Sequence, residues 1–248
     1  MHTRKKIVFA INNLGMGGAE NMLVEQVRCV DRDLFDPYVI TLLKNQKVNV
    51  IDKLPKDIKF IQFDFTSIFS LYALYKLWAF LRREKIDAII TNLFDTNLLG
   101  RVAAILARVP VIISYELNVD VLKKSWQTKI DRFLAHFTKK ILVSSNEVLD
   151  FTSKQQRIPK SKFLLNFNSI PLKLGEIKKN RNQVLLKYGL PEGQTYIVTA
   201  GSLTPQKGHV HLIDAVSQMK EQGVTGFKIL IFGRGALKDK TLSQIQRL

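Results

Sequence analysis

The chain has 248 residues, of which 46% are hydrophobic, so it is long enough for one large domain or two smaller ones. Lys and Arg number 38 against 21 Asp and Glu, and the net charge of +17 favours an acidic partner or a lysine-rich solvated surface. The single cysteine, Cys29, excludes an internal disulfide framework, and we expect neither a signal peptide nor a membrane-spanning helix.

Apolar runs typical of strands alternate with helical patterns along the first 170 residues. We predict strands over residues 7–11, 38–43, 60–63, 88–91, 111–114 and 141–144, and helices over 19–30, 68–85, 96–107 and 121–139. This alternation predicts a doubly wound α/β unit, in which six or more parallel strands carry helices on both faces.

A polar and basic stretch over residues 173–182 reads as a linker. After it we predict a short helix ending at Tyr188 and Gly189, a strand over 196–200, a helix over 210–222, a strand over 227–232 and a helical pattern from residue 239. The domains are therefore predicted at 1–172 and 183–248. Because two strands are too few for a sheet covered by helices, we expect the second domain to be partial.

Two glycine-rich turns, residues 15–20 and 201–208, each stand between an apolar strand and a helix. Glycine lets the backbone approach a ligand closely, and the start of the following helix favours an anion, so both turns indicate a phosphate-bearing ligand. The first turn breaks the dinucleotide fingerprint because Glu20 stands where a glycine is required. This disfavours a nicotinamide-dependent dehydrogenase.

Three motifs together resemble the family 4 retaining glycosyltransferases of GT-B architecture. They are Gly15-x-Gly17-Gly18-Ala19-Glu20, Ser144-Ser145-Asn146 and Gly201-Ser202-Leu203-Thr204-Pro205-Gln206-Lys207-Gly208, which is followed by a matching strand and turn up to Gly235. The resemblance implies an α/β protein with a complete N-terminal Rossmann-like domain and the beginning of a second. It also implies a nucleotide-sugar held mainly by the second domain and an acceptor mainly by the first.

Within the resemblance, Gly15, Gly17, Gly18 and Glu20 approach the reacting sugar and the donor phosphates, and Ser202, Lys207 and Gly208 hold the donor. Each turn is also explained by local structure alone, Glu20 by the helix dipole and Lys207 as an exposed turn lysine. Ser202 stands where the family usually has an arginine. A serine hydroxyl supplies no charge, so either the site is weaker or another cation substitutes.

Glu116 and Asn118 follow the predicted strand 111–114 and are the catalytic candidates, because Glu116 falls where many relatives carry a histidine that contacts the donor sugar. The alternative role for Glu116 is to cap the next helix. We expect no metal and no cofactor, since the nucleotide-sugar is the substrate. The four histidines have no metal-ligand spacing, and no Asp-x-Asp pair follows a strand.

The predicted helix 121–139 carries an aromatic stripe together with Lys123, Lys124, Lys139 and Lys140. Such a helix either docks on anionic lipid or packs on the sheet. We expect a cytoplasmic protein, peripheral on the inner face of the cytoplasmic membrane. No nucleic-acid partner is expected, because the sequence lacks an aromatic and basic reading surface.

Together these features predict a glycosyltransferase that moves a sugar from a nucleotide-sugar to a glycan or lipid-linked acceptor in polysaccharide biosynthesis. The alternative is a truncated, non-catalytic remnant or one component of a split enzyme. In the family two glutamates that hold the donor would lie beyond Leu248. We therefore expect this chain alone to have little activity unless a partner chain completes the second domain.

Overall fold

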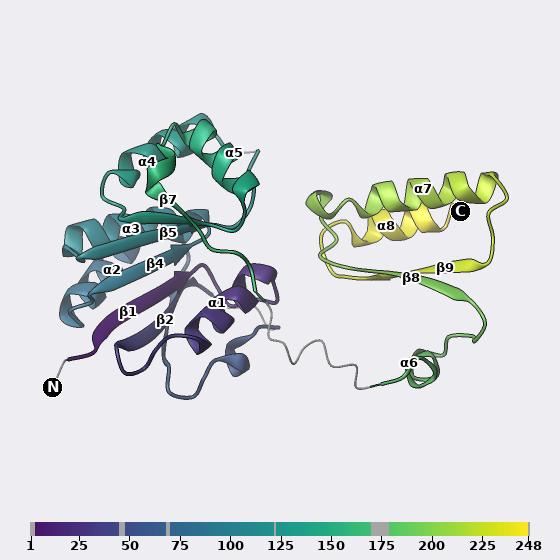
Figure 1. Cartoon of the computed structure of the whole chain (residues 1–248), viewed down its shortest axis with the longest axis horizontal. Helices are drawn as coiled ribbons and strands as arrows, with labels where there is room; N and C mark the ends of the chain where they lie inside the picture. Colours follow the sequence, from purple (N-terminus) through teal and green to yellow (C-terminus); the bar gives the residue numbers. More distant parts are fainter. Residues whose placement is uncertain (1–2, 45–47, 68–69, 122, 170–178, 248) are drawn as a thin grey trace. The chain divides into compact units, whose positions relative to one another are not determined.

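The computed structural model describes residues 3–44, 48–67, 70–121, 123–169 and 179–247 (Figure 1). The chain divides into two compact units, Met1–Gly175 and Glu176–Leu248. Most of the predicted linker, 173–178, lies outside the described residues, and only its end, 179–182, is seen, where it leads into a helix.

The first unit is built on a seven-stranded parallel sheet in the order β3-β2-β1-β4-β5-β6-β7. Its strands are β1 (Lys5–Ile11), β2 (Phe35–Leu43), β3 (Lys59–Phe65), β4 (Ala88–Asn92), β5 (Val111–Glu116), β6 (Lys140–Val143) and β7 (Phe163–Leu165). Its helices are α1 (Gly18–Arg28), α2 (Leu71–Arg83), α3 (Phe94–Ala107), α4 (Ser125–Ala135) and α5 (Asn146–Gln156). The predicted doubly wound sheet is confirmed.

The central strands of this sheet are apolar on consecutive residues because both of their faces are buried. Val8 and Ala10 of β1 belong to one hydrophobic cluster, which includes residues of α2 and α3. Phe9 and Ile11 belong to a second cluster with residues of α1. Side chains alternate across a strand, so α1 and the α2–α3 pair cover opposite faces of the sheet.

Among the α-helices and strands of the first unit, α5 and β7 were not predicted. Helix α5 has a polar sequence, with Val148 and Thr152 buried, and it begins at Ser145, whose hydroxyl accepts a hydrogen bond from the Val148 N–H at 3.2 Å. Strand β7 has only three residues and pairs with β6 alone. The predicted helix 121–139 is also too long, since α4 covers only Ser125–Ala135.

The second unit contains a two-stranded parallel sheet of β8 (Thr195–Ala200) and β9 (Phe227–Phe232). Its helices are α6 (Arg181–Tyr188), α7 (His209–Glu221) and α8 (Lys238–Ile245). Figure 1 shows α7 and α8 side by side along one face of the sheet. The predicted strands and the predicted end of α6 at Tyr188 are confirmed, with Gly189 left-handed at φ 62° as its cap.

The described part of the chain contains no helix that is both long and apolar enough to cross a membrane.

Candidate functional site

The order of strands in the first sheet reverses between β1 and β4, because the chain winds one way from β1 to β3 and the other way from β4 to β7. In open α/β sheets, ligands bind beyond the carboxyl ends of the strands at such a reversal. The turn after β1, the turn after β4 and the end of β5 therefore bound the candidate site of the first unit.

The turn after β1 carries the first predicted glycine motif. The Gly15 N–H donates to Asn13 Oδ1 at 3.0 Å, and Gly15 forms an isolated antiparallel bridge with Asn49. Gly17 precedes α1, and an added Cβ there would collide with the carboxylate of Glu20. Burial raises the pKa of Glu20, which lies in the first turn of α1. Gly18 is the first residue of that helix.

Sequence reasoning missed two residues that meet beyond the ends of β1 and β4, Asn12 and Asp95, the latter in the first turn of α3 (Phe94–Ala107). Asn12, which follows β1, donates from Nδ2 to Asp95 Oδ2 at 3.1 Å and accepts from the Thr96 N–H at 3.1 Å. Burial raises the pKa of Asp95. Leu93, which joins β4 to α3, has φ 69° and ψ 155°, a conformation that L residues rarely adopt. No sequence motif marks the turn after β4, so it can be identified as part of the site only from the order of the strands.

Glu116, at the end of β5, does not cap α4. Its carboxylate pairs with Lys123 Nζ at 3.2 Å, and Lys123 Nζ also lies 2.7 Å from Asp131 Oδ2. Asp131 in turn pairs with Arg101 of α3. The side chains of Lys123, Asp131 and Arg101 are only 2–3% exposed, whereas that of Glu116 is 15% exposed. A buried ion network therefore ends at a carboxylate that reaches the surface.

The network corrects the assignment of Lys123 as a lipid-binding surface charge. Burial lowers the pKa of Lys123, but the neighbouring Glu116 and Asp131 carboxylates raise it by more, so the lysine pKa lies above its usual value. Burial dominates at Glu116 and raises its pKa, although the Lys123 charge opposes the effect. Lys123 thus stabilises buried carboxylates.

Asn118 lies two residues beyond β5 and is exposed. The loop that contains Asn118 is held by Ser144, directly after β6, whose Oγ donates to the Leu117 carbonyl at 2.8 Å. Ser144 belongs to the Ser144-Ser145-Asn146 motif, so this motif positions the loop of Glu116 and Asn118 and begins α5.

In the second unit, the turns after β8 and β9 are joined by their backbones. The Gly201 N–H donates to the Phe232 carbonyl at 2.9 Å, and the Leu203 N–H donates to the Arg234 carbonyl at 2.8 Å. An added Cβ at Gly233 would collide with the Gly201 carbonyl. Glycine is therefore required at position 233 for this close approach, and the exposed Arg234 adds a cation to the paired turns.

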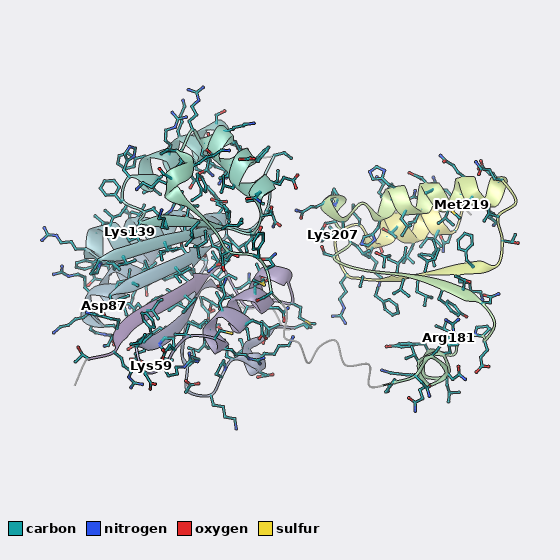
Figure 2. All side chains as sticks on the ribbon, in the orientation of Figure 1. Lys59, Asp87, Lys139, Arg181, Lys207 and Met219 are labelled. Carbon is teal, nitrogen blue, oxygen red and sulfur yellow. The ribbon has the colours of Figure 1, made fainter. Side chains whose placement is uncertain are left out.

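Lys207 ends the short 3₁₀ helix Pro205–Lys207 and is exposed (Figure 2). Gly208 follows with φ 65°, a left-handed conformation that glycine adopts readily, and α7 begins at the next residue. None of the described side chains caps the start of α7, and its first turn has no acidic residue. Ser202 Oγ lies 3.3 Å from Thr204 Oγ1 on the exposed part of the turn. This arrangement of free N–H groups, hydroxyls and a cation suits an anion.

Within the described ranges, no group of three or more His, Cys, Asp or Glu side chains is placed to hold a metal ion.

The strand order, the two glycine turns and the two Rossmann-like units define an α/β protein of the GT-B type. A model described as Glycosyltransferase Family 4 matches residues 16–173, and one described as Glycosyl transferases group 1 matches residues 180–248. The chain therefore belongs to Glycosyltransferase Family 4.

Three known proteins illustrate the similarity. The Escherichia coli UDP-Gal:alpha-D-GlcNAc-diphosphoundecaprenol alpha-1,3-galactosyltransferase is 27% identical over 176 residues, which cover 68% of this chain and 45% of that protein. Anabaena HepE in complex with UDP and glucose has a TM-score of 0.76 and 17% identity, covering 98% of this chain and 66% of HepE. A glycosyltransferase from Rickettsia africae ESF-5 has a TM-score of 0.75 and 14% identity, covering 99% and 65%.

The chain thus spans less than half the length of the curated relative that it matches, and just under two thirds of these two solved structures.

Proposed function

We propose that this protein acts in sugar transfer from a nucleotide-sugar donor to a glycan or lipid-linked acceptor. The observation that carries the proposal is the turn Gly201–Gly208, where Lys207 stands at the uncapped start of α7. Two relatives support the choice of ligands: HepE is described in complex with UDP and glucose, and the E. coli enzyme is named for a UDP-linked donor and a lipid-diphosphate acceptor.

Lys207 and the start of α7 act on the leaving group. When the bond between the sugar and the diphosphate breaks, negative charge grows on the diphosphate. A preorganised cation and free N–H groups stabilise that charge more than they stabilise the ground state, and losing one such donor costs about 3–4 kcal/mol in well-studied sites. Ser202 supplies a hydroxyl but no charge, and the exposed Arg234 is the second cation available to the paired turns. We propose that no metal ion takes part.

The first unit offers a different chemistry, suited to sugar hydroxyls. Glu20 lies at the start of α1 after β1, Asp95 at the start of α3 after β4, and Glu116 at the end of β5. These three strands are neighbours in the sheet. Ionised carboxylates accept hydrogen bonds from hydroxyls, and burial strengthens such bonds. We propose that Glu116, held by Lys123, and the exposed Asn118 bind sugar hydroxyls here, with the Gly15–Gly18 turn beside them.

We also propose peripheral association with an anionic membrane through α4. Trp126, Phe133 and Phe137 are 43%, 62% and 50% exposed, although Leu134 packs in the core. The exposed lysines near these rings are Lys124, Lys129 and Lys139. The surface of α4 and its flanking residues is therefore basic and aromatic although Lys123 is buried. Aromatic rings at the headgroup level and nearby lysines are the features by which peripheral helices bind acidic lipid. We propose that this association takes place on the cytoplasmic side of the membrane.

The test is calorimetric binding of UDP to the 248-residue chain. Lys207→Ala removes a hydrogen bond to a charged group and is expected to weaken binding roughly 10-fold to 100-fold. Lys220→Ala is the matched control, because it removes the same charge near the opposite end of α7, where Figure 2 labels Met219. Equal affinity in the wild type and the Lys207 variant would contradict the proposal.

A second measurement asks whether the chain alone turns over. The purified protein is incubated with nucleotide-sugars and membrane acceptors, and product is followed with time. Binding of UDP without turnover would support the non-catalytic or split-chain alternative, whereas turnover abolished by Lys207→Ala would show a functioning transferase.

A further inference from the structure

His209, the first residue of α7, is an unusual buried side chain. It is only 5% exposed, and its Nε2 atom has no hydrogen-bond partner among the described residues. A buried polar nitrogen without a partner lowers stability, and an apolar side chain of similar size would fill the same space without that loss. The imidazole therefore calls for a role beyond packing.

The position of Nε2 points to that role. An added Cβ at Gly201 would lie 3.7 Å from His209 Nε2, 3.7 Å from Lys207 Cγ and 3.8 Å from Lys207 Cδ. His209 Nε2 and the aliphatic stem of Lys207 thus both border the space beside Gly201, the first residue of the glycine turn. Because Lys207 has an exposed and flexible side chain, its stem is the movable part of the boundary of this space.

The surroundings favour an anion at this nitrogen. Helix α7 has 13 residues, its first turn contains no acidic side chain, and Gly208 provides no side-chain cap. The start of the helix therefore carries free N–H groups and a partial positive charge next to the imidazole. Lys207 adds a full charge on the same turn.

We propose that His209 is a further donor-binding residue, whose Nε2–H donates a hydrogen bond to a phosphate oxygen of the donor diphosphate. Lys207 binds the same diphosphate, and movement of its stem away from Gly201 opens the space that the nitrogen borders. The proposal rests on the proposed function and names a second donor at its site. It also explains how the turn holds a diphosphate although Ser202 supplies no charge.

A metal-binding role for the imidazole has no support. His211, two residues along α7, points to another side of the helix, and no metal-ligand group is found in the described part of the chain. A hydrogen bond to an anion needs one donor nitrogen, and the buried Nε2 has no partner among the described residues.

The experiment compares His209→Leu and His209→Gln with the exposed control His211→Ala. Binding of UDP and of inorganic pyrophosphate is measured by calorimetry, and stability by urea unfolding. We expect His209→Leu to weaken both ligands about 10-fold with equal or higher stability, since a hydrogen bond to a charged group is lost and an unpaired polar atom is removed. His209→Gln retains a side-chain N–H near Nε2 and is expected within about threefold of the wild type, as is His211→Ala.

Ring-nitrogen NMR on the wild-type protein gives a readout that does not depend on the variants folding. Saturating pyrophosphate is expected to shift the His209 Nε2 signal, which the His209→Gln spectrum assigns. An unshifted Nε2 signal, or wild-type affinity in His209→Leu, would overturn the role of His209. If Lys207→Ala loses UDP and His209→Leu keeps it, only this inference fails; if the wild type binds neither UDP nor pyrophosphate, the proposed function fails with it.

Discussion

Replacing Lys123 by methionine is expected to destabilise the first unit strongly. The side chain is 3% exposed and lies 3.2 Å from Glu116 and 2.7 Å from Asp131, so its removal leaves the largely buried Glu116 carboxylate without its partner and Asp131 with Arg101 alone. Breaking a buried ion pair from one side costs about 3–5 kcal/mol. That is a large part of the roughly 5–15 kcal/mol that stabilises a typical domain.

The size of the effect separates the buried network from ordinary surface pairs. Lys59 makes a contact of similar length, 2.8 Å to Asp36, but its side chain is 53% exposed (Figure 2). Such pairs contribute less than about 1 kcal/mol, so Lys59→Met is the matched control. A double variant, Lys123→Met with Glu116→Gln, removes the unpaired charge and is expected to recover at least half of the loss.

The assay is urea unfolding followed by tryptophan fluorescence. The two tryptophans, Trp78 and Trp126, both belong to the first unit, so the signal reports that unit. A loss of 3–5 kcal/mol lowers the midpoint by roughly 1–3 M, for a slope of about 2–3 kcal/mol per molar urea. Equally small shifts for Lys123→Met and Lys59→Met would refute the reasoning, as would a double variant no more stable than the single one.

Three further outcomes are expected. Burial raises the pKa of Glu116 above its ordinary value of 4.5, so the folded state binds the proton more tightly than the unfolded state. The contribution of Glu116 to the free energy of unfolding therefore falls as pH rises through the raised pKa. Urea unfolding of Glu116→Gln, measured against pH, should lack that fall. Gly233→Ala places a Cβ against the Gly201 carbonyl and should abolish calorimetric UDP binding, while Gly193→Ala, at a glycine with open space but left-handed φ, should cost stability without changing affinity. Replacing Lys124, Lys129 and Lys139 by Gln should reduce sedimentation of the protein with acidic vesicles and flatten its salt dependence. Lys123 is left unchanged in this variant because it is buried. Unchanged sedimentation would leave α4 a packing role only.

The central strands and the glycine turns could be predicted because their signals are local. A strand buried on both faces must be apolar on consecutive residues, as in Val8 to Ile11. A turn that places Gly233 against the Gly201 carbonyl must use glycine, whatever lies elsewhere in the chain. Helix α5 was missed for the opposite reason, since its sequence is mostly polar and few of its side chains are buried.

The charged part of the site could not be predicted, because it depends on which side of α4 faces the sheet. Lys123 reads as a surface lysine among several, and nothing local distinguishes it from Lys124, which is exposed. Its burial follows only when α4 packs beside α3, so that Asp131 meets Arg101. His209 was considered only as a metal ligand, and its role becomes visible once Nε2 is found without a partner beside Gly201.

The two units carry complementary chemistry, which supports a division of labour in the proposed reaction. The carboxyl edge of the first sheet presents Glu20, Asp95 and Glu116, whose raised pKa values all have burial as the main cause. Carboxylates repel a diphosphate but accept hydrogen bonds from sugar hydroxyls. The turn at the start of α7 presents Lys207 and free N–H groups, which attract a diphosphate and offer little to a neutral hydroxyl. Each unit therefore offers a surface suited to a different ligand group, and the proposed nucleotide-sugar substrate carries both groups, a diphosphate at one end and hydroxyls at the other.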